Sequence, residues 1–328
     1  MKVFLIAVGA ALVAIAAVSL VIASRAPQFD YGRYRDQVFK SQAVLDREPC
    51  DRGAVVRLVN AKMRAGDNRG AITSARAFLD GCGDLLPLRE ALFAAHRRLS
   101  ERDVAIAEAS HLLKAQPWNP TYLWWRGQVY GEKGDWTRAL EDQRRSAALC
   151  PDCMGQFDFA DALEKVGRPC EAIEPLATVL TLRRNVRRSA VEGRLAELRA
   201  RSECREWNGT GTARFPYERA AAFAPLSVNG VPLGRAIVDT GATYVAISRQ
   251  DAQRARLTGP ALDARFNTAG GVRTGRITGA ASVEAGGVRA QHVTVVIMDG
   301  LPMPLLGMSF LSRFDMLLDR DGVELRER

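Results

Sequence analysis

Histidine is nearly absent from this chain. Among its 328 residues, only His96, His111 and His292 are histidines. Zinc sites usually combine histidine and cysteine at short, regular spacings, and none of the three histidines has such a spacing to the six cysteines. The sequence therefore predicts no zinc site, and we expect no bound metal.

Nucleic-acid-binding motifs are missing as well. The formal net charge is +9, and several arginines are doubled, for example Arg97-Arg98 and Arg144-Arg145. No paired-cysteine finger and no glycine-aromatic ribonucleoprotein signature accompanies them. Because the doubled arginines fall in amphipathic helical patterns, we expect solvated helix faces and no nucleic-acid partner.

The sequence does not have the low hydrophobicity of a disordered chain, because 47% of its residues are hydrophobic and 25% are charged.

The sequence begins with one long apolar run. From Val3 to Ser24 every residue is apolar or small, which is enough for a helix to span a bilayer. A cleavable signal peptide, the alternative, would normally have a shorter apolar core. We expect residues 1–25 to be an uncleaved transmembrane anchor, followed by a linker over residues 26–49.

The cysteines indicate on which side of the membrane the chain lies. Basic residues after the apolar run, such as Arg25 and Arg33, mildly favour retention inside the cell. An even number of cysteines in one region instead suits an oxidising compartment. All six lie between the apolar run and the last third of the chain: Cys50, Cys82, Cys150, Cys153, Cys170 and Cys204. We therefore expect a single-pass protein of the bacterial inner membrane with its bulk in the periplasm.

Residues 50–205 have a helical pattern that repeats about every 34 residues. In each unit a short turn precedes an alanine and a branched apolar residue. These alanines are 34, 34 and 33 positions apart, at Ala71, Ala105, Ala139 and Ala172. Stacked helix pairs need a small residue where two helices cross closely, so the period predicts a helical solenoid.

The third unit resembles the tetratricopeptide repeat most closely. It carries glycine, tyrosine, alanine and terminal proline at the positions of that family, namely Gly127, Tyr130, Ala139 and Pro151. The resemblance implies a concave surface for a peptide or protein partner.

The same helical register suggests how the cysteines pair. Cys50 begins the first helix of one pair and Cys82 ends the second, so an antiparallel hairpin brings them together. Cys170 and Cys204 can meet in the same way, which leaves Cys150 and Cys153 as a local pair. A C-x-x-C spacing is also used by thiol oxidoreductases, but the strand-then-helix setting is missing here, so we expect a structural bridge.

Residues 206–328 change to short alternating runs punctuated by glycine, which predicts an all-β domain. Within it, two apolar residues lead directly into the loop Asp239-Thr240-Gly241-Ala242-Thr243. Farther along the chain stand Leu305, Leu306 and Gly307, and between the two motifs lie Ala269, Gly270 and Gly271. In this order the motifs resemble the retropepsin-type aspartic proteases, in particular their bacterial membrane-anchored branch. The whole chain is thus expected to be a multidomain α plus β protein.

The resemblance implies a role for each of these segments. Asp239 would be the catalytic carboxylate, Thr240 would hydrogen-bond across a dimer, and Gly241 would let the substrate backbone approach. Residues Ala269 to Gly271 would form the tip of a flap over the substrate, and Leu305 to Gly307 would support the catalytic loop. Since the chain has a single Asp-Thr-Gly, the second carboxylate would come from another copy of the same chain.

Two functions from different classes follow. The first is an aspartic endopeptidase that cleaves protein substrates with a carboxylate dyad and water, without a cofactor. The alternative is a repeat-based adaptor whose β-domain dimerises and is catalytically inactive. The other acids of the domain are expected to be caps or solvated charges: Asp251, Asp263, Asp299, Asp315 and Asp319.

Overall fold

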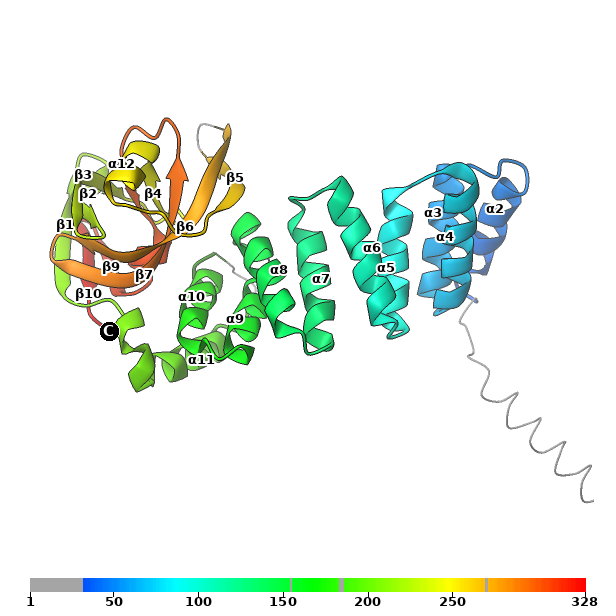
Figure 1. The fold of residues 1–328 in the computed structure, drawn as a ribbon, viewed down its shortest axis with the longest axis horizontal. Coiled ribbons are helices and arrows are strands. Elements are labelled where there is room, and N and C mark those ends of the chain that lie inside the picture. The colour runs from blue at the N-terminus through cyan, green and yellow to red at the C-terminus, as the bar shows by residue number, and fades with distance from the viewer. Residues whose placement is uncertain (1–31, 154, 183–185, 269–270) are drawn as a thin grey trace, which may run out of the picture. The chain divides into compact units, whose positions relative to one another are not determined.

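The computed structural model describes residues 32–153, 155–182, 186–268 and 271–328 (Figure 1). Contacts within the chain divide it into two compact units, one ending at Glu101 and the other extending from Arg102 to Arg328. The predicted transmembrane anchor, residues 1–25, lies outside the described residues. Within the described ranges, no helix combines the length and the apolar character needed to cross a membrane.

The first unit is built from helices. Their bounds are α2 Arg35–Leu45, α3 Arg52–Arg64, α4 Asn68–Cys82 and α5 Leu86–Arg98. Aspartate caps two of them, because Asp51 accepts a hydrogen bond from the amide of Ala54 and Asp67 accepts one from the amide of Gly70. The repeat alanine Ala71 is buried in the core of this unit.

Helix α2 forms within residues 26–49, the segment that the sequence analysis assigned to a linker. It has no side-chain amino-terminal cap and little amphipathic signal, so its pattern alone did not indicate a helix. Its end nevertheless packs on the first unit, since Leu45 lies against the cluster of Val55 and Val59. Tertiary packing thus stabilises a helix that the residues of this segment do not specify by their own pattern.

The helical pattern continues into the second unit. Its bounds are α6 Arg102–Ala115, α7 Pro120–Glu132, α8 Trp136–Leu149, α9 Gly155–Lys165, η1 Pro169–Ala172, α10 Ile173–Leu182, α11 Arg188–Ala200 and η2 Ser202–Trp207. The repeat alanines Ala105, Ala139 and Ala172 are at most 1% exposed. At Gly127 a Cβ atom would approach Gln143 Nε2 to 2.7 Å, so a larger residue on α7 would force the Gln143 side chain of α8 to move. A helical repeat region followed by a β-domain is therefore confirmed.

The cysteines form three disulfides: Cys50–Cys82, Cys150–Cys153 and Cys170–Cys204. The first joins the start of α3 to the end of α4, and the last joins η1 to η2. These are the pairs that the helical register predicted. The local pair lies at the carboxyl-terminal cap of α8, where the helix dipole disfavours a thiolate, unlike the helix amino termini of reactive C-x-x-C sites.

The rest of the second unit is one extended sheet with two short helices. The elements are β1 Thr212–Glu218, β2 Ala221–Val228, β3 Val231–Val238, β4 Val245–Ser248, α12 Arg249–Arg254, β5 Leu262–Thr268, β6 Gly271–Ala285, β7 Val288–Met298, β8 Leu305–Leu306, α13 Met308–Leu311, β9 Asp315–Asp319 and β10 Gly322–Arg326. The strand order is β5-β6-β7-β4-β8-β3-β2-β1-β10-β9, with a further pairing of β6 to β2. Strands β5 and β9 are therefore the two ends of the sheet.

One buried arginine connects the helical part of this unit to the sheet. Arg313 follows α13 and its side chain is fully buried. It donates hydrogen bonds to the carbonyl of Trp207 at 2.8 Å and to the Glu174 carboxylate at 3.0 Å. Because Glu174 belongs to α10, this ion pair joins the last repeat to the β-domain.

Candidate active site

The loop Asp239–Thr243 connects β3 to β4. In the sheet, β8 lies between these two strands. Strand β3 ends at Val238 and pairs in parallel with β8, with Ile237 opposite Leu305 and Val238 opposite Leu306. Strand β4 begins at Val245 and pairs with β8 from the other side. The loop between β3 and β4 must therefore cross over the end of β8. The two motifs, about 65 positions apart in sequence, meet at this crossing.

Backbone hydrogen bonds hold the loop on this support. The amide of Asp239 donates to the carbonyl of Leu306 at 3.1 Å, and the amide of Met308 donates to the carbonyl of Ala242 at 2.8 Å. Inside the loop, the amide of Ala242 donates to the carbonyl of Asp239 at 3.2 Å. Both ends of the loop are thus attached to the segment around Gly307.

Gly307 is required by the close contact between this segment and the loop. A Cβ atom there would lie 2.2 Å from the carbonyl oxygen of Tyr244 and 2.7 Å from that of Ala242. Real Cβ atoms do not approach backbone oxygens so closely, so no other residue fits without moving the loop. This gives a physical reason for a glycine after Leu305 and Leu306.

The Asp239 side chain is half-buried, and Thr240 and Gly241 beside it are exposed. Its Oδ1 accepts a hydrogen bond from the amide of Gly241 at 2.9 Å, which orients the carboxylate. An exposed loop tip next to a half-buried carboxylate leaves this group accessible to a substrate or to a second copy of the loop.

Asp239 differs in its charged neighbours from the five aspartates that the sequence predicted to be caps or solvated charges. Ser248 caps α12 by accepting a hydrogen bond from the amide of Asp251 and donates one to the Asp251 carboxylate, which also lies 3.2 Å from Arg254. The remaining four each lie within 4 Å of an arginine nitrogen: Asp263 with Arg276, Asp299 with Arg249, Asp315 with Arg328, and Asp319 with Arg214. Hydrogen bonds from these arginines lower the pKa of Asp299 and of Asp319. No ion pair involves Asp239 among the residues that the structure describes, so a paired arginine does not neutralise it.

A hairpin of β5 and β6 stands where the sequence predicted a flap. Its strands pair as far as Thr268 and Gly271, and Thr268 Oγ1 donates to the carbonyl of Gly271 at 2.7 Å. Gly271 has φ +100°, a conformation that favours glycine. The predicted tip residues Ala269 and Gly270 lie outside the described residues.

The hairpin contacts the segment that leaves the loop. Phe266 of β5 meets the Tyr244 ring edge-on, with ring centroids 6.4 Å apart. Burial and the nearby Glu174 carboxylate raise the pKa of the Tyr244 hydroxyl above its ordinary value, so it stays protonated. Tyr244 and Phe266 thus connect the hairpin to the candidate catalytic loop. The sequence analysis assigned no role to either residue.

Ser309 is a further residue of this site to which sequence reasoning assigned no role. Its side chain is 3% exposed. Its Oγ accepts a hydrogen bond from the amide of Val245 at 3.0 Å and donates one to the carbonyl of Thr294 at 2.7 Å. Ser309 therefore joins the start of β4 to β7 beneath the loop. In the sequence, the position of Ser309 two residues after Gly307 could have indicated a role near the loop. The neighbouring residues do not show which backbone groups its side chain contacts.

The sequence was compared with models of protein families and with curated proteins. A family model described as aspartyl protease matches residues 224–310. The matched stretch begins in β2, includes Asp239 and the β5–β6 hairpin, and ends in α13. No curated protein matches the chain.

Solved structures of two kinds each match part of the chain. A retropepsin-like aspartic protease from Rickettsia conorii is 26% identical, with a TM-score of 0.31, over 36% of this chain and 93% of that chain. The MamA protein is 18% identical, with a TM-score of 0.42, over 51% of this chain and 86% of that chain. A tetratricopeptide repeat protein from Parabacteroides merdae is 18% identical, with a TM-score of 0.44, over 52% of this chain and 67% of that chain. The family model confirms the resemblance to aspartic proteases that was found in the sequence of the region it matches.

Proposed function

We propose that this chain is an aspartic endopeptidase whose active site is completed by a second copy of the chain. The observation that carries the proposal is the Asp239 loop, which is held over β8. The amide of Gly241 orients its carboxylate, and no arginine of the described residues pairs with it. In this mechanism two carboxylates share one proton. One activates a water molecule and the other polarises the peptide carbonyl. Each copy supplies one Asp239, and no cofactor takes part.

The edge strand β9 supports assembly of the second copy. It ends the sheet, so one side of its backbone is unpaired within the described part of the chain. Leu317 and Leu318 of this strand are 48% and 50% exposed. An edge strand with large exposed apolar side chains is typical of a surface that pairs with another chain. A partner strand on β9 would pair with the unpaired backbone groups of this edge.

The remaining expectations belong to the same proposal. The helical repeats bind the protein substrate or a partner, which brings it to the β-domain. Residues 1–25 anchor the chain in the bacterial inner membrane with its bulk in the periplasm, where the three disulfides persist. Confinement to the membrane raises the effective concentration of protomers and so favours assembly of the split site.

Cleavage of an unfolded protein by the full-length chain in mild detergent tests the function. Wild type and Asp239→Asn are compared from acidic to neutral pH. The substitution keeps the shape of the side chain and removes the acid, so we expect cleavage to fall by at least about a thousandfold. Below the dimer dissociation constant, the rate should rise with at least the second power of protein concentration.

The alternative function has its own outcome in this experiment. A folded dimer that cleaves none of several substrates over that pH range would be a repeat-based adaptor with an inactive β-domain. A monomer that cleaves would contradict the shared site.

A further inference from the structure

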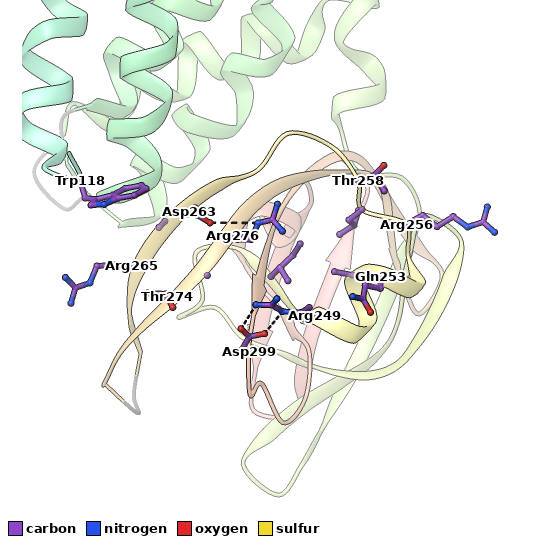
Figure 2. A pocket seen from close by; sticks show the side chains of 15 residues that line it. Trp118, Arg249, Gln253, Arg256, Thr258, Asp263, Arg265, Thr274, Arg276 and Asp299 are labelled. Atoms are coloured by element: carbon purple, nitrogen blue, oxygen red, sulfur yellow. Dashed lines mark hydrogen bonds and ion pairs between the residues drawn. The ribbon is translucent and has the colours of Figure 1, made fainter. Parts of the chain in front are cut away.

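A cavity of about 870 Å³ lies between the β5–β6 hairpin and helix α12 (Figure 2). Successive side chains of a strand point to opposite faces, and directly paired residues share a face. Phe266 contacts Tyr244, so Arg265 and its cross-strand partner Thr274 lie on the other face. Both line the cavity. The cavity is therefore separated from the candidate active site by the thickness of the hairpin.

The lining of this cavity carries excess positive charge. Four of its side chains are arginines and two are aspartates: Arg249, Arg256, Arg265, Arg276, Asp263 and Asp299. These groups come from α12, from the turn that follows it, from the hairpin and from the end of β7. The excess thus arises from segments that only the fold brings together.

The arginines differ in how well they are paired. Arg249 forms two hydrogen bonds with the Asp299 carboxylate, at 2.9 and 2.6 Å. The pair of Arg276 with Asp263 is looser, at 3.9 Å. Arg256 and Arg265 are exposed and form no ion pair with any residue that the structure describes. Figure 2 shows these two side chains at opposite ends of the cavity and pointing away from each other, so each guanidinium is available to a separate carboxylate, which it can bind through two parallel hydrogen bonds.

Two further features suit an extended peptide. Strand β5, which contributes Arg265, is an end strand of the sheet, and among the described residues its backbone pairs with another strand on one side only. A peptide can add to such an edge through main-chain hydrogen bonds. Trp118, which is 47% exposed, also lines the cavity and offers an apolar contact.

We propose that this cavity is a docking site for an acidic peptide segment, whose carboxylates pair with Arg256 and Arg265. The occupant is a segment of a protein that the candidate active site would cleave, so its role as substrate rests on the proposed function. Its binding does not require Asp239. A bound segment would bridge the hairpin and α12, since Arg265 belongs to the first and Arg256 follows the second.

The test is direct binding to the full-length Asp239→Asn chain in mild detergent, which prevents cleavage during the measurement. The probe is a short fluorescein-labelled peptide rich in glutamate, followed by fluorescence anisotropy. A peptide with glutamine at every glutamate position is the uncharged counterpart. We expect the glutamate peptide to bind more tightly and its affinity to fall with added salt, because exposed ion pairs are screened.

Two double variants with equal loss of charge decide where the peptide binds. Arg256→Gln/Arg265→Gln should raise the dissociation constant of the glutamate peptide about tenfold or more, since two charge-assisted contacts are lost. Arg219→Gln/Arg320→Gln removes two exposed arginines outside the cavity and should leave the constant nearly unchanged. Thermal unfolding checks that both variants remain folded.

Three results would overturn the proposal. They are equal binding of the glutamate and glutamine peptides, equal weakening by the two double variants, and stronger competition by a single-stranded oligonucleotide than by the acidic peptide. None of these depends on catalysis. A chain that fails to cleave but binds the glutamate peptide through Arg256 and Arg265 would therefore disprove the proposed protease and retain the docking site.

Discussion

At the residue scale, Arg199 is a half-buried cation where the helical part of the second unit meets the β-domain. Arg199 of α11 donates to the carbonyl of Ser312 at 3.2 Å, while its Nε is buried without a hydrogen-bond partner. Burial, together with the neighbouring charges of Arg328 and Arg313, lowers the pKa of Arg199 to about 10. A cation held among other cations opposes folding while it remains protonated.

Replacing this cation by an apolar side chain of similar length should stabilise the protein. We expect Arg199→Met to raise the free energy of unfolding at pH 7 by about 1 kcal/mol, as measured by urea denaturation. A decrease instead would mean that the hydrogen bond to Ser312 outweighs the buried charge.

The same substitution has a defined pH dependence. The folded pKa of Arg199 is about 10, which is below the ordinary value of an arginine. Between these values the unfolded chain binds more protons than the folded chain, so the stability of the wild type gains from rising pH. The advantage of Arg199→Met should be complete below about pH 10 and should shrink as the pH rises towards the ordinary pKa of an arginine.

At the element scale, the contact between β8 and the candidate catalytic loop depends on one glycine. In Gly307→Ala the new Cβ would overlap the carbonyl oxygen of Tyr244, so the loop must move away from β8. We expect a loss of about 3 kcal/mol in the free energy of unfolding and loss of any cleavage activity. Urea unfolding and the cleavage assay measure the two effects.

A second glycine of the same domain offers a matched control. Gly279 of β6 has no atom within 4 Å of an added Cβ, so Gly279→Ala should change the free energy of unfolding by less than about 1 kcal/mol and keep activity. Equal effects of the two substitutions would show that the tight contact at Gly307 is not what positions the loop.

At the scale of the whole molecule, the proposed dimer forms through the edge strand β9, so a change on this strand should weaken dimerisation. Leu318→Lys places a charge on the exposed edge, which disfavours pairing with a second strand. We expect the dimer dissociation constant to rise at least about tenfold, as measured by analytical ultracentrifugation. The protein concentration needed for cleavage should rise in parallel.

An exposed apolar residue outside the β-domain serves as the control for this effect. Val104 of α6 is 36% exposed, and Val104→Lys should leave dimerisation unchanged. A wild-type dimer that persists in Leu318→Lys would place the interface elsewhere on the chain.

The sequence by itself determined most of the architecture. The alanine period predicted buried crossings, because only a small residue fits where two helices approach closely. The apolar pair before Asp239, together with Leu305, Leu306 and Gly307, resembled the motifs of aspartic proteases, and this resemblance implied the support of the loop. Such motifs are local, and the backbone geometry they require is visible in the residue types themselves.

Tertiary structure decided the rest. Helix α2 forms because it packs on α3, although its own pattern is weak. The roles of Ser309 and Arg313 depend on backbone carbonyls that only the folded chain brings within reach. The cationic cavity likewise requires α12 and the hairpin to meet. Contacts between residues far apart in sequence depend on strand order and register, and no local pattern of residues specifies those.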